Sequence, residues 1–129
     1  MKYALLIYSP PADPDTSGYD TGEHREPSGE GGLTWLEYTR AVREAGVLVA
    51  VEQLTAVDSA TSVSVRGGER LLTDGPFAET KEHLLGFYLL DLPDLDTALD
   101  WAARMPSAGY GTIEVRPVRT GMAWQAALA

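Results

Sequence analysis

Two short stretches of the chain are apolar at almost every position. One covers residues 3–8, near the start, and the other covers residues 84–92. Both are too short to cross a bilayer, and both are rich in aromatic and branched side chains. Such runs are typical of strands that are buried on two faces. We therefore expect them to be the central strands of a sheet.

A helix is predicted after residue 33, where apolar residues recur at spacings of three and four. Its apolar stripe consists of Trp35, Tyr38, Val42 and Ala45. Thr34 and Glu37 have the spacing of a capping box. Gly46 stands where a glycine commonly ends a helix.

A second helix is predicted after residue 93. Either Asp94 or Asp96 would cap its first turn, and Pro106 and Gly109 would stop it. Its apolar stripe consists of Leu95, Ala98, Leu99, Ala102 and Met105.

Residues 47–54 and 110–118 are predicted to be strands that carry charge. Glu52 interrupts the first, whereas Glu114 and Pro117 lie in the second. Proline cannot donate to a strand ladder, which suits a sheet edge. Residues 62–66 and 69–73 flank Gly67-Gly68 and predict a hairpin with a two-residue turn.

The predicted order is strand-helix-strand, a hairpin, then strand-helix-strand. This is the ferredoxin-like, or split βαβ, arrangement of an α+β fold, with the two apolar strands in the centre. Two helices cover only one face of such a sheet. A second copy of the sheet is the simplest cover for the other face, so we expect a homodimer.

The chain has 129 residues, which suits a single domain. Residues 9–32 form a segment rich in Pro, Gly, Asp and Ser, which predicts a lid, a binding loop or a flexible loop that includes His24. Residues 119–129 are expected to form a short tail in which Met122 and Trp124 could anchor on another surface.

The formal net charge is -9, which argues against nucleic acid or an anionic membrane as a partner. Cysteine is absent, so disulfides and thiolate metal sites are excluded. Nothing resembles a signal peptide, and we expect a cytoplasmic protein. Two histidines make a protein-built metal site improbable, and no cofactor is expected.

The strongest turn signal is Asp74-Gly75-Pro76-Phe77. An aspartate in a turn commonly bonds the N–H two residues on, but here that residue is Pro76, which has none. Asp74 should therefore project from a stiff corner, either into a site or into solvent. After the turn, Glu79, Lys81 and His83 stand at alternate positions and share one face if the segment is extended.

These residues resemble a known signature. The Asp74–Phe77 turn, the following AETKE segment and Gly86-Phe87-Tyr88 are similar to the YCII-related, DGPF-domain family, and the similarity extends to the first strand and to residues 114–117. The resemblance implies a dimeric α+β barrel with a cleft near the turn. Some relatives are lyases of small cyclic compounds that use a His–Asp pair, with the His near the start of the first helix. Here that region holds Thr34, Trp35 and Leu36. Other relatives are thought to accompany extracytoplasmic-function sigma factors.

Two hypotheses follow. The first is a cofactor-free lyase or isomerase of a small cyclic metabolite, in which Asp74 and His83 exchange protons. The residues expected to bind its ligand are Tyr8, Glu52, Phe77 and Arg116. The second is a non-catalytic binding or regulatory dimer, with a sigma factor as a candidate partner. Each residue also has a structural interpretation: His83 and Glu52 as solvated strand residues, and Arg116 as the surface partner of Glu114.

Overall fold

The computed structural model describes residues 1–10, 26–77, 81–121 and 123–128. The elements, in chain order, are β1 (Lys2–Ser9), α1 (Trp35–Glu44), β2 (Leu48–Gln53), the short 3₁₀ helix η1 (Val57–Ser59), β3 (Thr61–Arg66), β4 (Glu69–Asp74), β5 (His83–Asp91), α2 (Leu95–Ala103), β6 (Thr112–Pro117) and α3 (Ala123–Ala126).

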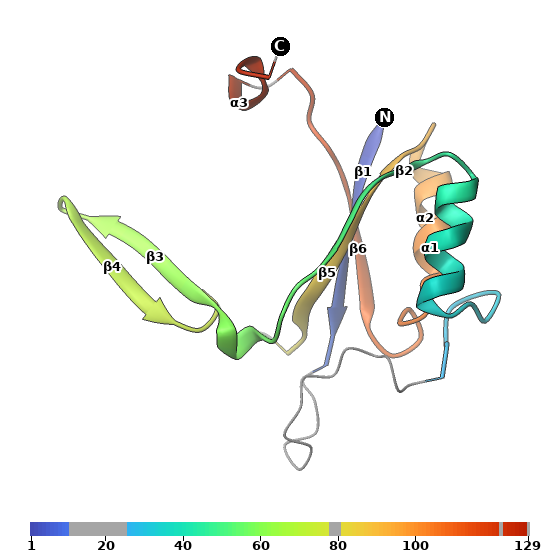
Figure 1. The fold of residues 1–129 in the computed structure, drawn as a ribbon, viewed down its shortest axis with the longest axis horizontal. Coiled ribbons are helices and arrows are strands. Elements are labelled where there is room, and N and C mark those ends of the chain that lie inside the picture. The colour runs from blue at the N-terminus through green and yellow to red at the C-terminus, as the bar shows by residue number, and fades with distance from the viewer. Residues whose placement is uncertain (11–25, 78–80, 122, 129) are drawn as a thin grey trace.

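Four strands form one antiparallel sheet in the order β2-β5-β1-β6 (Figure 1). The two apolar strands, β1 and β5, are central, and the strands that carry acids are at the edges. This is the order expected of the split βαβ arrangement. The α+β fold class and the positions of the central strands are therefore confirmed.

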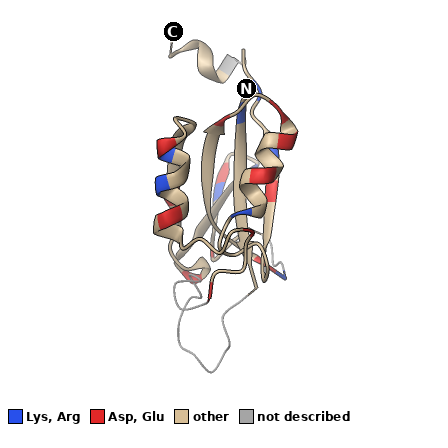
Figure 2. Ribbon diagram, turned by 90° about the vertical axis from the view of Figure 1, so that its right-hand side faces the viewer, with Lys and Arg blue, Asp and Glu red and all other residues tan. Residues whose placement is uncertain are grey.

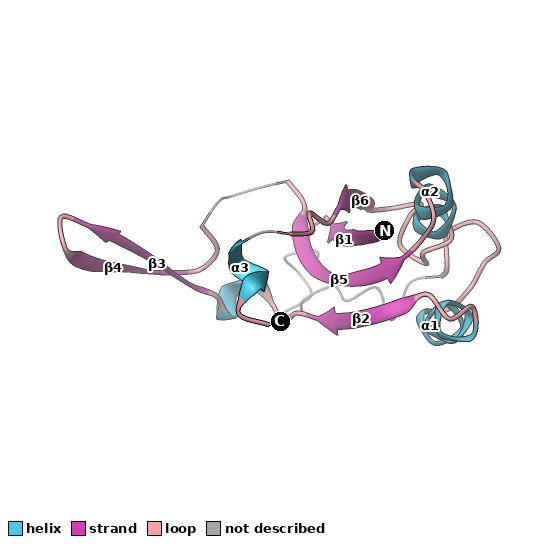
Figure 3. Ribbon diagram, turned by 90° about the horizontal axis from the view of Figure 1, so that it is seen from above, coloured by secondary structure: helices cyan, strands magenta, loops and turns pink. Residues whose placement is uncertain are grey.

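Both helices cover the same face of this sheet, and the core lies between them and the strands (Figure 3). Alternate residues of β1 point into this core, because successive strand side chains point to opposite faces. The largest fully buried side chains of the core are Leu5, Tyr38, Val42, Leu90, Leu92 and Met105. The charged residues lie along the two helices in Figure 2, whereas the strands behind them are mostly uncharged.

Helix α1 begins and ends as predicted. The Thr34 hydroxyl accepts from the Glu37 N–H, and the Glu37 carboxylate accepts from the Thr34 N–H, both at 3.2 Å. This capping box lowers the pKa of Glu37, chiefly through the backbone bond from Thr34. Gly46 follows the helix at φ 76°, in the left-handed conformation that glycine tolerates.

Helix α2 is capped by Asp94, one of the two predicted caps, whose carboxylate accepts from the Thr97 N–H at 2.8 Å. Its predicted apolar stripe is wrong in part. Leu95 and Leu99 are 48% and 47% exposed, so including them in the buried stripe was wrong. The buried residues of α2 are Ala98 and Ala102, and both have small side chains.

The face of the sheet that points away from the helices is apolar in its centre. We call it the open face. Strand pairing assigns to it Ala4, Leu6 and Tyr8 of β1, Ala50 of β2, and Phe87 and Leu89 of β5, all only partly buried. Glu52 lies opposite Phe87, and Glu114 lies opposite Leu6, so an acid stands on each edge. The two central strands, which are predicted to be buried on both faces, are therefore covered by helices on only one face within a single chain.

Strands β3 and β4 form a two-stranded hairpin, Thr61–Asp74, that we call the arm. Its turn is Gly67-Gly68, with φ of 56° and 80°, as a tight hairpin turn requires. Figures 1 and 3 both show the arm leaving the sheet on the side opposite the helices.

The described part of the long loop is tied to the end of α2. Ser28 and Glu30 donate their N–H groups to the carbonyls of Pro106 and Ala103, at 2.9 and 2.8 Å. His24 lies outside the described residues, so the interpretation of its segment as a lid stays a prediction. In the tail, Trp124 is 87% exposed, so within the described residues it does not anchor on another surface, and Met122 is outside them. No helix in the described ranges is long and apolar enough to cross a membrane.

Candidate functional site

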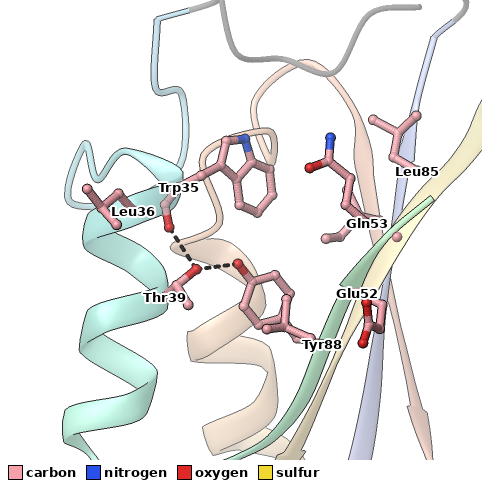
Figure 4. A pocket seen from close by; sticks show the side chains of 10 residues that line it. Trp35, Leu36, Thr39, Glu52, Gln53, Leu85 and Tyr88 are labelled. Carbon is pink, nitrogen blue, oxygen red and sulfur yellow. Dashed lines mark hydrogen bonds between the residues drawn. The ribbon is translucent and has the colours of Figure 1, made fainter. Parts of the chain in front are cut away.

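A cavity of about 300 Å³ lies between the start of α1 and the sheet (Figure 4). We call it the helix cavity. Helix α1 contributes Trp35, Leu36 and Thr39, and the sheet contributes Ile7, Val51, Glu52, Gln53, Leu85, Gly86 and Tyr88. A concave, mostly apolar site with a few polar groups is the usual form of a small-molecule site.

Aromatic rings form one wall of the helix cavity. The Trp35 and Tyr88 rings are stacked, with centroids 6.2 Å apart and an interplanar angle of 18°. The Tyr38 ring packs edge-on against the Tyr88 ring, with the ring centroids 5.3 Å apart. The Tyr38 hydroxyl in turn donates to the Trp101 carbonyl at 2.9 Å, which joins the wall to α2. This packing gives the cavity a rigid flat side.

The Thr39 hydroxyl sets the direction of the Tyr88 hydroxyl. Thr39 donates to the Trp35 carbonyl at 2.8 Å, and its Oγ1 is 2.6 Å from the Tyr88 Oη. A threonine has a single hydroxyl proton. Both bonds can form together only if Tyr88 is the donor to Thr39. The Tyr88 oxygen therefore retains lone pairs, and toward a ligand it is an acceptor.

Tyr88 remains a neutral phenol at physiological pH. It is 4% exposed, and this burial raises its pKa above the usual value. A buried, protonated phenol binds and orients a ligand but is not a base at neutral pH.

Two further polar side chains belong to residues that line the cavity, Trp35 and Gln53. The Trp35 Nε1–H is buried and has no hydrogen-bond partner within the part of the chain that the structure describes. Figure 4 shows the Trp35 indole and the Gln53 amide on two sides of the cavity. A buried N–H without a partner costs free energy, so a ligand whose acceptor reached this N–H would offset that cost.

The edge strand β2 separates its polar side chains between two faces. Gln53 pairs with Gly86 and Val51 pairs with Tyr88, so both point toward the helices, whereas Glu52 points to the open face. Figure 4 draws Gln53 and Glu52 on opposite sides of the strand. No charged side chain is therefore directed into the cavity from the described lining residues.

Gly86 allows β2 to come this close. A Cβ on Gly86 would lie 2.5 Å from the Glu52 carbonyl oxygen, nearer than real contacts allow, and 3.1 Å from the Gln53 Cα. A register shift in the β1–β5 pairing lies between Ile7 and Tyr8, which leaves Leu85 without a Cα partner on β1. An irregularity of this kind re-aims a side chain, and Leu85 is buried at the cavity.

A second cavity, of about 440 Å³, lies where the arm joins the sheet. Its lining is mostly small and apolar, with Tyr8 and Leu84 from the sheet and Pro76 from the turn after β4. Two of its hydroxyls are engaged with each other, since Thr55 and Ser59 bond at 2.7 Å.

Sequence comparison identifies the family. The family model described as "YCII-related domain" matches residues 1–122, nearly the whole chain. The chain belongs to the YCII-related domain family. The YCII-related chain is also similar to a protein of Rhizobium meliloti (strain 1021) named "Uncharacterized protein R00369". The two are 38% identical over 120 residues, which cover 92% of each chain.

The residues predicted to be catalytic in this YCII-related chain do not meet in the described structure. Asp74 ends β4 on the arm and is exposed, and His83 begins β5 opposite Ser9. Neither lines either cavity, and among the described residues they share no hydrogen bond or ion pair. Phe77, predicted to bind the ligand, is 91% exposed. Gly75 has φ 96°, so the corner is formed as predicted.

The remaining predicted residues gather on the open face. Tyr8, Glu52 and Arg116 come from three strands of the sheet and share that side. Arg116 is 4.0 Å from the Glu114 carboxylate, and both side chains are largely exposed, which matches the surface-pair interpretation. Of the predicted residues, Glu52 lines the helix cavity and Tyr8 lines the second cavity.

Of the residues that line the helix cavity, the sequence selected only Glu52 as a site residue. The aromatic and polar residues that it missed are Trp35, Thr39, Gln53 and Tyr88. Trp35 belongs to the predicted apolar stripe of α1, and in the structure it both packs against the core and lines the cavity. Within the described ranges, no group of three or more His, Asp or Glu residues gathers as a metal site would require.

Proposed function

We propose that this YCII-related protein binds a small, neutral, ring-shaped compound in the helix cavity. The observation that carries the proposal is the buried Trp35 N–H, which has no partner among the described residues and lies beside a stacked aromatic wall. The indole N–H supplies a donor, the Tyr88 oxygen an acceptor, and Gln53 one of each. A flat ring with a carbonyl oxygen and an N–H or O–H complements this set.

Neutrality follows from the lining. Glu52 is the one charged residue among those that line the cavity, and its carboxylate lies on the other face. A buried ion without an opposite charge is strongly disfavoured. The chain should therefore bind lactams, pyridones and related neutral rings more tightly than carboxylates or amines of the same size.

The experiment is a thermal-shift screen with single-ring neutral fragments, repeated on two variants of the same strand. Val51 lines the cavity and is 37% exposed, whereas Val49 is 45% exposed and lines neither cavity. Val51→Phe should fill the cavity and abolish stabilisation by the fragments, and Val49→Phe should preserve it. Fragments that stabilise both variants equally would place binding elsewhere, and the absence of any stabilising fragment would refute the proposal.

Analysis of the bound compound separates binding from catalysis. Recovery of the compound unchanged after incubation supports a binding protein. Conversion would instead favour the lyase or isomerase expected from the resemblance, and Asp74 and His83 would then need to act from outside the helix cavity. Association with a sigma factor stays a prediction of the resemblance alone.

We also propose a homodimer formed through the open face, which would close the two sheets into the barrel expected of the family. Its support is the row of partly exposed apolar side chains, with Leu6 and Phe87 opposite each other at the centre. Sedimentation analysis of Leu6→Asp, against Leu99→Asp on the exposed flank of α2, tests it. Only the first should yield monomers; a dimer that survives Leu6→Asp would contradict this interface.

A further inference from the structure

The arm has one apolar face that nothing in the described chain covers. Val63 pairs with Leu72 and Val65 pairs with Arg70, so these four side chains share a face. Val63 and Val65 are each 60% exposed, and Leu72 is 65% exposed. Leu71 lies on the other face, opposite Ser64.

Such a ribbon is not expected to be stable alone. A two-stranded hairpin is at best marginally stable in water and needs a further strand or a packed surface. Large apolar side chains grouped on a protruding element are typical of an interaction surface. The arm is nevertheless a regular ladder of six paired residues on each strand. A covering surface for the Val63–Leu72 side explains both observations.

The position of the arm indicates which molecule would cover its apolar face. It leaves the sheet on the side of the open face, and so does the C-terminal helix α3 (Figures 1 and 3). A molecule seated on the open face therefore lies beside the arm. Six strand residues span about 20 Å, and four strands at their usual spacing are about 15 to 20 Å wide. The arm is thus long enough to cross a sheet of the same size as its own.

Charge favours a second copy of this chain over an unrelated partner. Arg70 is the basic residue on the apolar face of the arm, and Asp74 lies at the base of the same face, opposite Thr61. The open face carries Glu52 on one edge, whereas on the other edge Glu114 is 4.0 Å from Arg116. In a two-fold arrangement, each arm would bring Arg70 toward the Glu52 edge of the other copy. This pairing offsets part of the repulsion between two chains of net charge -9.

We propose that the arm of each copy packs its Val63, Val65 and Leu72 face onto the sheet of a second copy, in a reciprocal exchange, with Arg70 at an acidic edge. The inference rests on the proposed homodimer and adds to it a second contact area. The dimer would then be held by two crossed arms as well as by the stacked open faces.

Adjacent leucines on the arm provide a matched test. Leu72→Ser removes a side chain from the proposed contact, and Leu71→Ser removes the same side chain from the opposite face, where it is 47% exposed. Each dimer contains two arms. Burying one leucine side chain strengthens binding by about tenfold, so two of them contribute about 100-fold. Leu72→Ser should therefore weaken the dimer about 100-fold in Kd by sedimentation equilibrium, and Leu71→Ser less than about threefold.

Hydrogen exchange of the unsubstituted protein gives a second readout. Amides of the arm should be protected when the protein is concentrated and should exchange rapidly after dilution below the Kd, while the core of the sheet stays protected. If Leu72→Ser dimerises as tightly as the unsubstituted protein, or the arm exchanges rapidly in the dimer, the arm contact is refuted and the open-face dimer stands. A protein that is monomeric at every concentration refutes both.

Discussion

The bond between Thr39 and Tyr88 offers a sharp test of how the helix cavity is built. Tyr88 is 4% exposed and its oxygen is 2.6 Å from the Thr39 Oγ1. Thr39→Val keeps the shape of the side chain but removes the hydroxyl, which leaves a buried phenol donor without its partner. The cost of an unsatisfied buried donor is about 1–3 kcal/mol of unfolding free energy.

The Tyr88→Phe variant should be milder. It removes one hydrogen bond, a net loss of about 1 kcal/mol, and leaves Thr39 still bonded to the Trp35 carbonyl. In the double variant Thr39→Val/Tyr88→Phe no donor is orphaned. The double variant should lose about as much unfolding free energy as Tyr88→Phe, apart from a small change in the stability of α1. The sum of the losses in the two single variants should therefore exceed the loss in the double variant by about 1–2 kcal/mol.

Urea denaturation of the four proteins at neutral pH measures this coupling, with Thr39→Ser as a control that keeps the hydroxyl. Independent sites add to within about 0.5 kcal/mol. Additivity within that limit would refute the inference that Tyr88 donates to Thr39, and with it the conclusion that the Tyr88 oxygen is an acceptor for ligands.

Three further predictions concern single features. Gly86→Ala should destabilise the fold by about 1–3 kcal/mol in urea, because its Cβ would lie 2.5 Å from the Glu52 carbonyl oxygen and must push β2 away; an unchanged midpoint would contradict the tight approach. Asp74→Asn should change stability by less than about 0.5 kcal/mol, since Asp74 is exposed and without a hydrogen bond in the described structure; a larger loss would assign it a structural role. Burial raises the pKa of both Tyr38 and Tyr88 above their usual value of 10.0, so their contribution to stability is complete below pH 10 and is lost as the pH rises through the higher folded values. Urea titrations from neutral pH to above pH 10 should show this fall, with a shallower slope in Tyr88→Phe; equal slopes would contradict the buried neutral phenol.

The sequence predicted the sheet because its signals are local. Uninterrupted apolar runs identified the central strands, and acids identified the edges. The capping pair Thr34 and Glu37 and the Gly67-Gly68 turn depend only on neighbouring residues, and all formed as predicted. The stripe of α2 was overestimated because periodicity does not report how much of a helix face the sheet covers; only Ala98 and Ala102 of that face are buried, and Leu95 and Leu99 are half-exposed.

The candidate site was harder to predict because it depends on contacts between distant residues. Thr39 and Tyr88 are 49 positions apart in the chain, and neither has a pattern that distinguishes it from a core residue. The Asp74 corner attracted attention because its charge and its turn are visible in the sequence. What the sequence did not contain was the place of Asp74 at the base of the arm, opposite Thr61, where it lines neither cavity.

The central claim is that the Trp35 N–H binds a neutral ring in the helix cavity. The chain has three tryptophans, Trp35, Trp101 and Trp124, so a ¹⁵N-labelled sample gives three indole N–H signals. Titration with 2-pyridone, which carries one carbonyl oxygen and one ring N–H, tests the claim directly. We predict a saturable shift of the Trp35 signal, with the exposed Trp124 signal unchanged. A Trp35 signal that does not move at any concentration of 2-pyridone or of a stabilising fragment would contradict the claim.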